Sequence, residues 1–218
     1  MSSIIYKGLL KDLNSSLNKE FILMRGVNRT NVLKMEDKWM SAHSNTIRQI
    51  LDKANGDEVK TQELLDNCQI EDRGWSWSNK YNCLKENNNY EWFFIIIDNE
   101  VQGCCIICHP KDSRIDNKEV FYVDYIAIAP WNRETIFNKR QFSSVGTILL
   151  SIATSYSVSN YDYRHGFGLH ALPQAESYYL DKIGMDNYGK DKDKENLCYF
   201  EISEEKAKEL VNNNVKTK

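Results

Sequence analysis

The period of the hydrophobic pattern changes along the chain, and its first part has the period of a helix. Apolar and aromatic residues recur every three or four positions, at Leu33, Trp39, Met40, His43, Ile47, Ile50 and Leu51. This spacing puts them on one helical face, with Thr30 or Asn31 as the N-cap and Gly56 at the end. A second helix is expected around residues 64–68, whereas Phe21–Met24 fits a strand or a helix. We therefore expect the first 85 residues to be mostly helical.

Further along the chain, the pattern takes the composition of strands. Trp92–Ile97 is a continuous run of apolar, aromatic and β-branched residues, and Val101–Cys108 resumes after the dipeptide Asp98-Asn99. Two such runs separated by a short polar turn predict a β-hairpin. A third run, Val120–Ala129, predicts another strand that ends at a proline.

Helices and strands alternate in the remainder of the chain. A helical stripe follows Ser143 and Ser144 and extends to Tyr156. The later elements are a strand at Phe167–Ala171, a helix with Pro173 near its first turn, a strand at Leu197–Ile202 and a helix at Glu204–Val211. A strand, a crossover helix and a strand in succession imply a parallel pair within a mixed sheet. The predicted fold class is therefore α/β with a mixed sheet.

The predicted elements give the boundaries of three segments, and the composition argues against a membrane protein. The elements divide the chain into a helical N-terminal extension at residues 1–85, a core at 86–203, and a C-terminal helix and tail at 204–218. Of the 218 residues, 41% are hydrophobic and 27% are charged, which suits one sizeable core. No apolar run approaches the roughly 20 residues of a membrane span, and Lys7, Lys11 and Asp12 interrupt any signal peptide. We therefore expect a cytoplasmic protein without membrane contact.

The charge balance argues against a polyanionic partner. Lys and Arg number 28 against 31 Asp and Glu, which gives a net charge of −3. Neither half of the chain is strongly basic, so the electrostatic attraction that nucleic acid binding needs is missing. We do not expect nucleic acid as a partner.

Three of the six cysteines, Cys104, Cys105 and Cys108, lie in one strand-forming run. Without an export signal, we expect reduced, buried thiols rather than disulfides. Cys105, Cys108 and His109 also spell the attachment pattern for c-type haem. However, the two cysteines would point to opposite faces of a strand, about 10 Å apart along it, and no second Cys or His pair has zinc-binding spacing. We therefore expect neither haem nor a metal site.

A loop with several small residues joins the third predicted strand to the next helix. The strand ends at Ile126–Ala129, and Gln141–Thr147 leads into the apolar helix. The first turn of a helix presents unpaired N–H groups and about half a positive charge, which suits a pyrophosphate. The same residues also fit an ordinary N-cap, so the residue spacing has to decide between the two.

The spacing Gln141-x-x-Ser144-x-Gly146 resembles the acyl-CoA loop of the GNAT superfamily of N-acyltransferases, which has glycine where this chain has Ser144. Downstream, Ala175–Tyr179 and then Ile183–Met185 resemble the superfamily's Ala-x-x-Phe-Tyr helix and its closing Gly-Phe. Three more stretches resemble an uncharacterised bacterial subgroup: Trp75–Trp77 with Lys80, Ala129–Arg133, and Leu169–Glu176.

The resemblance covers residues 75–202 and implies a mostly antiparallel mixed sheet whose central parallel strands splay apart. It implies acetyl-CoA as co-substrate, with the pantetheine arm in the gap between these strands. The backbone of Ile126, Ala127 and Ile128 would pair with that arm. The pyrophosphate would bind the loop residues Gln141, Phe142, Ser143, Ser144, Val145, Gly146 and Thr147. The loop that precedes Gln141 is longer than in the superfamily.

Acyl transfer needs a neutral amine, a stabilised oxyanion and a proton for the leaving thiolate. The resemblance makes Tyr179 the general acid, with Tyr178 as a rival because one extra residue separates Tyr179 from Gly184. Asp124 and His170 are the candidate bases, since Asp124 is the one acid inside its strand and His170 lies on the neighbouring strand. All four candidate side chains also fit structural roles.

Aromatic and basic residues near these motifs have two interpretations each. Trp75, Trp77 and Trp131 fit the wall of an acceptor pocket or the core. Arg133 and Lys80 fit a contact with CoA phosphates or an acidic acceptor, or a solvated surface.

The sequence therefore predicts an N-acyltransferase that moves an acyl group, with acetyl as first choice, from acyl-CoA to a primary amine by direct attack in a ternary complex. The acceptor is a small-molecule or a macromolecular amine, and a homodimer is left open. The alternative is a catalytically silent acyl-CoA-binding or interaction module of the same fold.

Overall fold

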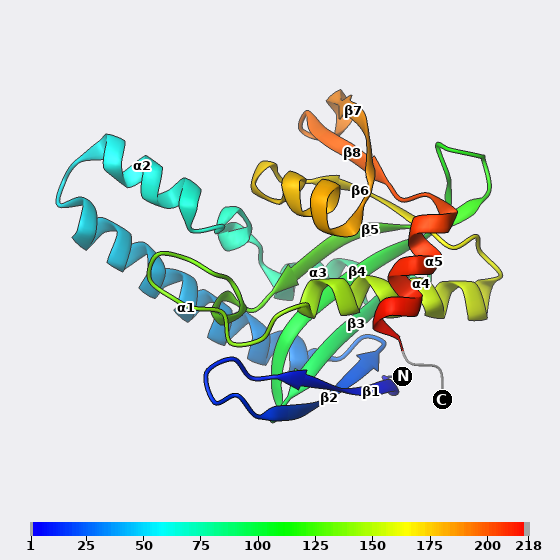
Figure 1. Ribbon diagram of the computed structural model, residues 1–218, viewed down its shortest axis with the longest axis horizontal. Coiled ribbons are helices and arrows are strands. Elements are labelled where there is room, and N and C mark those ends of the chain that lie inside the picture. Colours follow the sequence, from blue (N-terminus) through cyan, green and yellow to red (C-terminus); the bar gives the residue numbers. More distant parts are fainter. Residues whose placement is uncertain (1, 216–218) are drawn as a thin grey trace. The chain divides into compact units, whose positions relative to one another are not determined.

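The computed structural model of the chain describes residues 2–215 (Figure 1). Its strands are β1 (Ser3–Lys11), β2 (Asn18–Arg25), β3 (Tyr90–Ile97), β4 (Glu100–Asp112), β5 (Glu119–Ile128), β6 (Phe167–Ala171), β7 (Asp186–Asp191) and β8 (Leu197–Glu201). Its α-helices are α1 (Arg29–Ala54), α2 (Glu58–Asn67), α3 (Trp77–Leu84), α4 (Val145–Tyr161) and α5 (Glu204–Asn214). The short helical turns are η1 (Glu71–Gly74), η2 (Pro130–Asn132), η3 (Pro173–Ala175), η4 (Tyr178–Ile183) and η5 (Lys192–Lys194).

The strands form an 8-stranded sheet in the order β1-β2-β3-β4-β5-β6-β8-β7. β5 and β6 pair in parallel, whereas β1 with β2, β6 with β8 and β7 with β8 pair antiparallel. Helix α4 connects β5 to β6, which is the strand–helix–strand crossover that the sequence predicts. A mixed sheet combined with helices confirms the predicted α/β class.

Residues 3–25 correct the expectation of a mostly helical N-terminal part, because they form the β1–β2 hairpin. In β2, Phe21 and Leu23 are buried, whereas Ile22 and Met24 are more exposed. This alternation is the two-residue period of a strand. Phe21–Met24 is therefore a strand, and the predicted helices begin only at α1.

Helix α1 confirms the long predicted helix but has a different cap. The side chain of Asn28 accepts a hydrogen bond from the N–H of Asn31 at 3.0 Å, so Asn28 is the N-cap and the prediction of Thr30 or Asn31 is wrong. The helix is followed by Asn55 in left-handed conformation and then by Gly56. Asn is one of the few residues besides Gly that tolerates this conformation.

The buried face of α1 also differs from the predicted one. Its buried residues are Val32, Met35, Trp39, His43, Ile50 and Ala54. Leu33, Met40 and Leu51, which the sequence pattern placed on the buried face, are 48%, 52% and 55% exposed. The apolar stripe on this helix is therefore wider than the surface that the rest of the chain covers.

The strands predicted between Trp92 and Ala129 are confirmed as β3, β4 and β5, and β6 has the predicted bounds. After β6, the predicted helix with Pro173 near its first turn is present, but it begins as the 3₁₀ turn η3 and ends as the π-helical turn η4. Strand β7 has no predicted counterpart. Five of its residues are exposed and Asp191 is only partly buried, so it carries no hydrophobic alternation.

One compact unit comprises the described residues 2–86, 94–103 and 127–145. Within it, α1 packs against α2 and α3. The indole rings of Trp39 and Trp77 meet edge to face with centroids 5.7 Å apart. A buried, bidentate ion pair joins both terminal nitrogens of Arg133 to the two carboxylate oxygens of Asp72 at 2.6 Å. Such a pair fixes the loop after η2 to η1 with defined geometry.

Among the residues that the structure describes, the other compact unit comprises 87–93, 104–126 and 146–215. Within it, α4 and α5 are linked by a hydrogen bond from the Ser151 hydroxyl to the Leu210 carbonyl at 3.2 Å. The carboxylate of Glu201 is fully buried and accepts hydrogen bonds from Arg164 and from the Tyr199 hydroxyl, both at 2.8 Å. A buried carboxylate needs such partners because burial removes its hydration.

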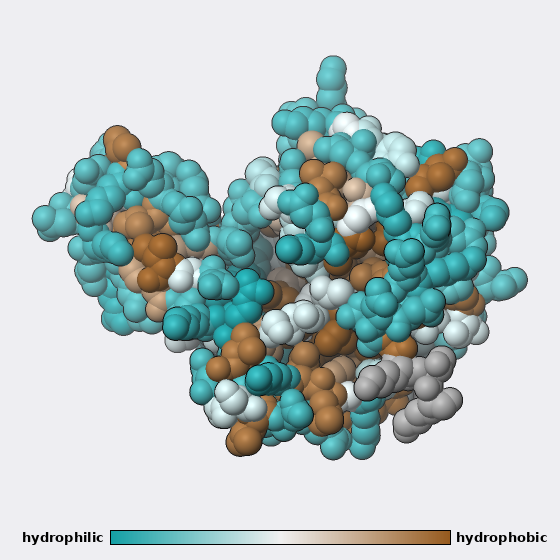
Figure 2. Space-filling view, viewed as in Figure 1, coloured by the Kyte–Doolittle hydropathy of each residue, from teal (hydrophilic) through white to brown (hydrophobic). Residues whose placement is uncertain are grey.

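The surface of the β1–β2 hairpin carries apolar side chains, visible as brown patches in Figure 2. The exposed apolar residues of this segment are Ile4, Leu9, Leu13 and Leu17. Among residues 2–215, no helix has both the length and the apolar character that crossing a bilayer requires.

Candidate active site

The chain enters α4 through a residue in left-handed conformation. Ser144 has φ +63° and is exposed, and Val145 begins the 17-residue helix. Left-handed conformation costs a non-glycine residue roughly 1–2 kcal/mol, so this position suits glycine. The acyl-CoA loop that this segment resembles has glycine at the position of Ser144. The turn leads directly to the first N–H groups of α4, which lack helical acceptors.

Two residues of the predicted pyrophosphate loop are held by the protein itself. The N–H of Gln141 donates to a backbone carbonyl at 2.9 Å, and its side-chain amide donates to Asp12 at 3.2 Å. The N–H of Phe142 donates to the side-chain oxygen of Asn132 at 3.1 Å, and Phe142 is buried. These bonds leave Ser143–Thr147 as the part of the loop that can meet an anion.

The parallel ladder between β5 and β6 is short. Its register runs from Phe121 opposite Phe167 to Val123 opposite Leu169. Beyond this point β5 continues to Ile128, while the end of β6 stays paired with β8. The ladder between the two parallel strands therefore opens in the middle of β5, as a splayed arrangement requires.

The backbone groups of β5 alternate between its two neighbours. The N–H of Ala129 donates to a β4 carbonyl at 2.9 Å, so alternation also turns Ala127 toward β4 and turns Ile126 and Ile128 the other way. The carbonyl of Ile128 accepts a hydrogen bond from Arg133 at 2.8 Å. Among the three residues predicted to pair with a pantetheine arm, Ile126 is thus the best placed.

Tyr178 and Tyr179 lie at the start of the π-helical turn η4, with ring centroids 5.3 Å apart. A π turn contains one residue more than an α turn would, which accommodates the extra residue before Gly184. The hydroxyl of Tyr178 lies 3.0 Å from the hydroxyl of Thr147, in the first turn of α4. The ring of Tyr179 is buried and packs against Phe200.

Burial raises the pKa of both Tyr178 and Tyr179, and the hydroxyl of Thr147 opposes this shift for Tyr178. A phenol with a raised pKa stays protonated at neutral pH, which is the state that a proton donor needs. Tyr178 is the one in contact with the predicted anion loop. Both residues remain candidates for the general acid.

One face of β5 carries half-buried side chains, namely Tyr122, Asp124 and Ile126. The hydroxyl of Tyr122 lies 2.8 Å from Nδ1 of His170 on β6. Burial and the nearby carboxylate of Asp124 raise the pKa of Tyr122 and of Tyr90 on β3. The two predicted bases therefore belong to one polar face, and Tyr122 connects them.

Two charged residues near His170 were not among the predicted site residues. The Oδ2 atom of Asp191 lies 2.8 Å from Nε2 of His170, and Arg114 forms an ion pair with Asp191. The hydrogen bond from Arg114, followed by that from His170, lowers the pKa of Asp191 to about 2. Burial lowers the pKa of His170, and Asp191 opposes this shift. Asp191 gave no signal because it ends the exposed strand β7.

The basic and tryptophan residues that the sequence placed near the site contact other residues of the protein. Arg133 is buried in its ion pair with an aspartate, so the interpretation of a solvated surface residue is wrong and its guanidinium is not available to phosphates. Lys80 lies over the ring of Trp75, with Nζ 4.8 Å from the ring centroid. Trp77 is buried, and the indole N–H of Trp131 donates to a buried glutamine at 2.8 Å.

The six cysteines differ in their surroundings. Cys105 lies beside Tyr179, and Cys108 lies beside Tyr90. Because side chains three residues apart in a strand lie on opposite faces, the two thiols face opposite sides of β4, as predicted. All six cysteines are free, but Cys83 is exposed, which corrects the expectation of buried thiols for this residue. Within residues 2–215, no group of three or more His, Cys, Asp or Glu side chains is arranged to hold a metal ion.

Comparison with known proteins finds likeness in structure but not in sequence. No protein-family model matches the chain, and its sequence matches no curated protein. A protein from Desulfovibrio desulfuricans assigned to the GNAT family of acetyltransferases matches with a TM-score of 0.51 and 12% identity, over 84% of this chain and 99% of that one.

Two further structures match over similar lengths. PaiA N-acetyltransferase from Thermoplasma acidophilum, solved in complex with coenzyme A, matches with a TM-score of 0.50 and 11% identity, over 83% of this chain and 97% of that one. A mosquito protein from Aedes aegypti assigned as arylalkylamine N-acetyltransferase 7 matches with a TM-score of 0.51 and 10% identity, over 93% and 95% of the two chains. The chain therefore has the fold of the GNAT acetyltransferases.

Proposed function

We propose that this chain is an acyl-CoA-dependent N-acyltransferase that moves an acyl group, with acetyl as the first candidate, to a primary amine. The observation that carries the proposal is the parallel β5–β6 ladder, which opens beyond Val123 and Leu169. The chain then runs from β5 into a helix whose first residue follows a left-handed Ser144. An open strand edge and a helix start are the two features that an extended thioester with a diphosphate needs.

The structural neighbours support the same donor. One of them was solved with coenzyme A bound, and the likeness covers most of both chains. The residues at the start of α4 fit a diphosphate, because Ser143, Gly146 and Thr147 are small and only half-buried. We assign the diphosphate to the backbone N–H groups of Ser143–Thr147, and the pantetheine arm to the backbone of Ile126.

The reaction requires one new bond and one broken bond. The neutral amine attacks the thioester carbon, the C–N bond forms, the C–S bond breaks, and CoA leaves as a thiol. Tyr178 or Tyr179 gives the thiolate its proton, since burial keeps both phenols protonated. Asp124 or His170 on the polar face of β5 and β6 takes the proton that the amine loses.

Thermal melting with acetyl-CoA tests the binding half of the proposal. Ligand at 100 times its Kd adds about 2.7 kcal/mol to the free energy of unfolding, which raises Tm. Gly146→Asp places a carboxylate beside the diphosphate and abolishes the shift. Gly74→Asp is the matched control, because no atom lies within 4 Å of a Cβ built at Gly74. An unchanged Tm of the wild type, even at millimolar acetyl-CoA, would reject the donor.

Release of free CoA thiol tests the chemical half. With a panel of primary amines, we expect thiol release that depends on both the amine and the protein. Binding of acetyl-CoA without turnover on any small amine would leave two candidates, a silent binding module and a transferase for macromolecules. Mass spectrometry of protein and tRNA samples treated with the chain and acetyl-CoA distinguishes them, because only the transferase adds acetyl groups.

A further inference from the structure

Four polar side chains form a continuous chain of contacts on the polar face that includes β5 and β6. The hydroxyl of Tyr122 lies 2.8 Å from Nδ1 of His170, and Nε2 of His170 lies 2.8 Å from Oδ2 of Asp191. The guanidinium of Arg114 completes the chain through its ion pair with Asp191. Strands β5, β6 and β7 and the residues after β4 thus each supply one member.

The partners of His170 fix which nitrogen carries the proton. An ionised carboxylate only accepts hydrogen bonds, and the paired Asp191 is ionised at neutral pH. Nε2 of His170 therefore carries the hydrogen and donates it to Asp191. Nδ1 keeps its lone pair and accepts the hydroxyl hydrogen of Tyr122. His170 is oriented as a base toward Tyr122, in the way that a carboxylate orients the histidine of a Ser-His-Asp triad.

The surroundings keep His170 neutral. The titratable and charged groups that face it are Tyr122, Tyr199, Asp191, Arg114 and Lys194. Burial lowers the pKa of His170, the positive charges of Lys194 and Arg114 lower it further, and Asp191 opposes them. A neutral imidazole whose Nδ1 carries no hydrogen is the form that can receive a proton at pH 7.

Tyr122 places these four contacting side chains next to the point where strands β5 and β6 separate. Tyr122 pairs with Gly168, one position before the parallel ladder ends at Val123 and Leu169. Asp124 is the next residue on the same face of β5. A thioester lying along the opened ladder would bring its carbonyl carbon past these side chains.

We propose that Tyr122 accepts the proton of the attacking amine and passes its own hydroxyl proton to Nδ1 of His170, with Asp191 as the positioning residue. This inference rests on the proposed function and names the base within it. Tyr122 and His170 act as a pair, whereas Asp191 acts only through His170. Arg114 holds Asp191 in place.

The protons balance across one turnover. As the C–N bond forms, the ammonium proton moves to the Tyr122 oxygen and the Tyr122 hydroxyl proton moves to His170, which becomes imidazolium. As the C–S bond breaks, Tyr178 or Tyr179 protonates the thiolate. His170 then releases its proton to water, and the tyrosinate recovers one from water.

Nitrogen NMR of the labelled chain tests the geometry without any turnover. We expect the Nε2-protonated tautomer of His170 at pH 7 to 8, identified among the chain's 4 histidines by the loss of its signals in His170→Gln. Tyr122→Phe should shift the Nδ1 resonance, because Nδ1 loses its donor. Protonation at Nδ1 in the wild type would overturn the proposal.

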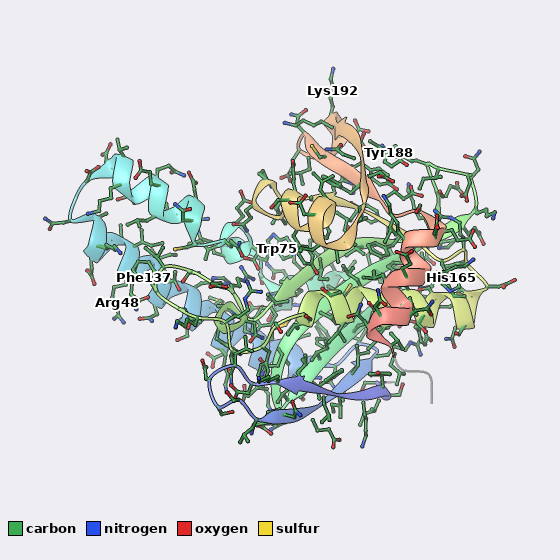
Figure 3. All side chains as sticks on the ribbon, viewed as in Figure 1. Arg48, Trp75, Phe137, His165, Tyr188 and Lys192 are labelled. Carbon is green, nitrogen blue, oxygen red and sulfur yellow. The ribbon has the colours of Figure 1, made fainter. Side chains whose placement is uncertain are left out.

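Steady-state kinetics, with the primary amine that gives the fastest thiol release, test the role of Tyr122 and His170 in turnover. Tyr122→Phe and His170→Gln should each lower kcat by roughly 10²-fold or more, the usual contribution of a general base, while the Kd for acetyl-CoA stays within about twofold. Tyr188→Phe is the control, since Tyr188 lies on the β7–β8 hairpin (Figure 3), is 42% exposed and contacts the ring of Tyr199. It should keep kcat within about twofold.

The pH profile separates positioning from mere structural support. The rate should fall as pH drops through the pKa of His170, because imidazolium cannot accept a proton. Asp191→Asn removes a negative charge, so this acidic limb should move to lower pH. Arg114→Gln removes a positive charge, so the limb should move to higher pH. A purely structural role predicts no such opposite shifts.

The two possible failures have different signatures. If the wild type releases no thiol with any acceptor, the proposed function fails and this inference fails with it. If the wild type is active but Tyr122→Phe and His170→Gln keep kcat within about threefold, the transferase stands and the relay is wrong. In that case a large loss in Asp124→Asn would assign the base to Asp124.

Discussion

At the scale of single residues, the neighbours decide what a charged side chain does. Arg133 ends the stretch Ala129–Arg133, which resembles an uncharacterised bacterial subgroup, yet its guanidinium is buried against Asp72 and the carbonyl of Ile128. His170 was one of two candidate bases, and the structure places its ring between the hydroxyl of Tyr122 and the carboxylate of Asp191. Neither outcome follows from residue type, because both depend on partners far away in the sequence.

Arg133→Met should destabilise the protein strongly. It leaves the buried carboxylate of Asp72 without its partner, and such a loss costs about 3–5 kcal/mol. The double variant Arg133→Met/Asp72→Leu should recover part of this loss, since it buries no lone charge. Urea unfolding curves measure both values. A loss below about 1 kcal/mol for Arg133→Met would mean that the pair contributes little to the fold.

Tyr178→Phe and Tyr179→Phe identify the general acid. The variant that removes the acid should lower kcat by roughly 10²- to 10⁴-fold, with little change in the Kd for acetyl-CoA. Tyr178→Phe also removes the hydroxyl contact with Thr147. Steady-state kinetics of both variants decide the assignment. Near wild-type kcat in both would contradict a tyrosine acid.

At the scale of elements, the start of α4 is the segment whose conformation the proposed function uses most directly. Ser144 has φ +63°, which a β-branched residue rarely adopts. Ser144→Gly should therefore leave the free energy of unfolding unchanged within about 1 kcal/mol, because relief of strain offsets the greater freedom of the unfolded chain. Ser144→Val should cost more than about 1 kcal/mol. Denaturant unfolding checks both, and equal stability of the two variants would contradict this turn.

Strand β6 is a second element with a sharp constraint. A Cβ on Gly168 would lie 2.1 Å from the hydroxyl oxygen of Tyr199, which is 1% exposed and cannot move aside. Gly168→Ala should therefore cost roughly 1–3 kcal/mol through overpacking. Gly74→Ala, in open space, is the control and should change stability little. Similar melting temperatures for both variants would show that Tyr199 is free to shift.

Elements with strong local patterns were predictable, and those without them were not. The β3–β4 hairpin and β6 consist of buried, apolar strands, so the pattern gave their positions. Strand β1 is largely exposed and β7 almost wholly so, and neither has a buried face that produces alternation. The π turn η4 depends on one extra residue before Gly184, and the sequence shows the extra residue but not the turn.

At the scale of the whole molecule, the fold agrees with the GNAT acetyltransferases although the sequence identity is only 10–12% in the three structures compared. The residues that the sequence predicts for the donor are contiguous stretches, namely the end of β5 and the start of α4, and their role stays a prediction. The sequence missed Asp191, which meets His170 only when β7 is in place, and Arg114, which follows β4 and forms an ion pair with Asp191. Long-range partners of this kind are set by topology, which a single local motif does not contain.

A crystal structure of the chain soaked with coenzyme A tests the central claim most directly. The account predicts that the diphosphate accepts hydrogen bonds from backbone N–H groups of Ser143–Thr147 and that the pantetheine arm runs beside Ile126. Coenzyme A bound elsewhere, or a start of α4 filled by the chain's own side chains, would contradict the account.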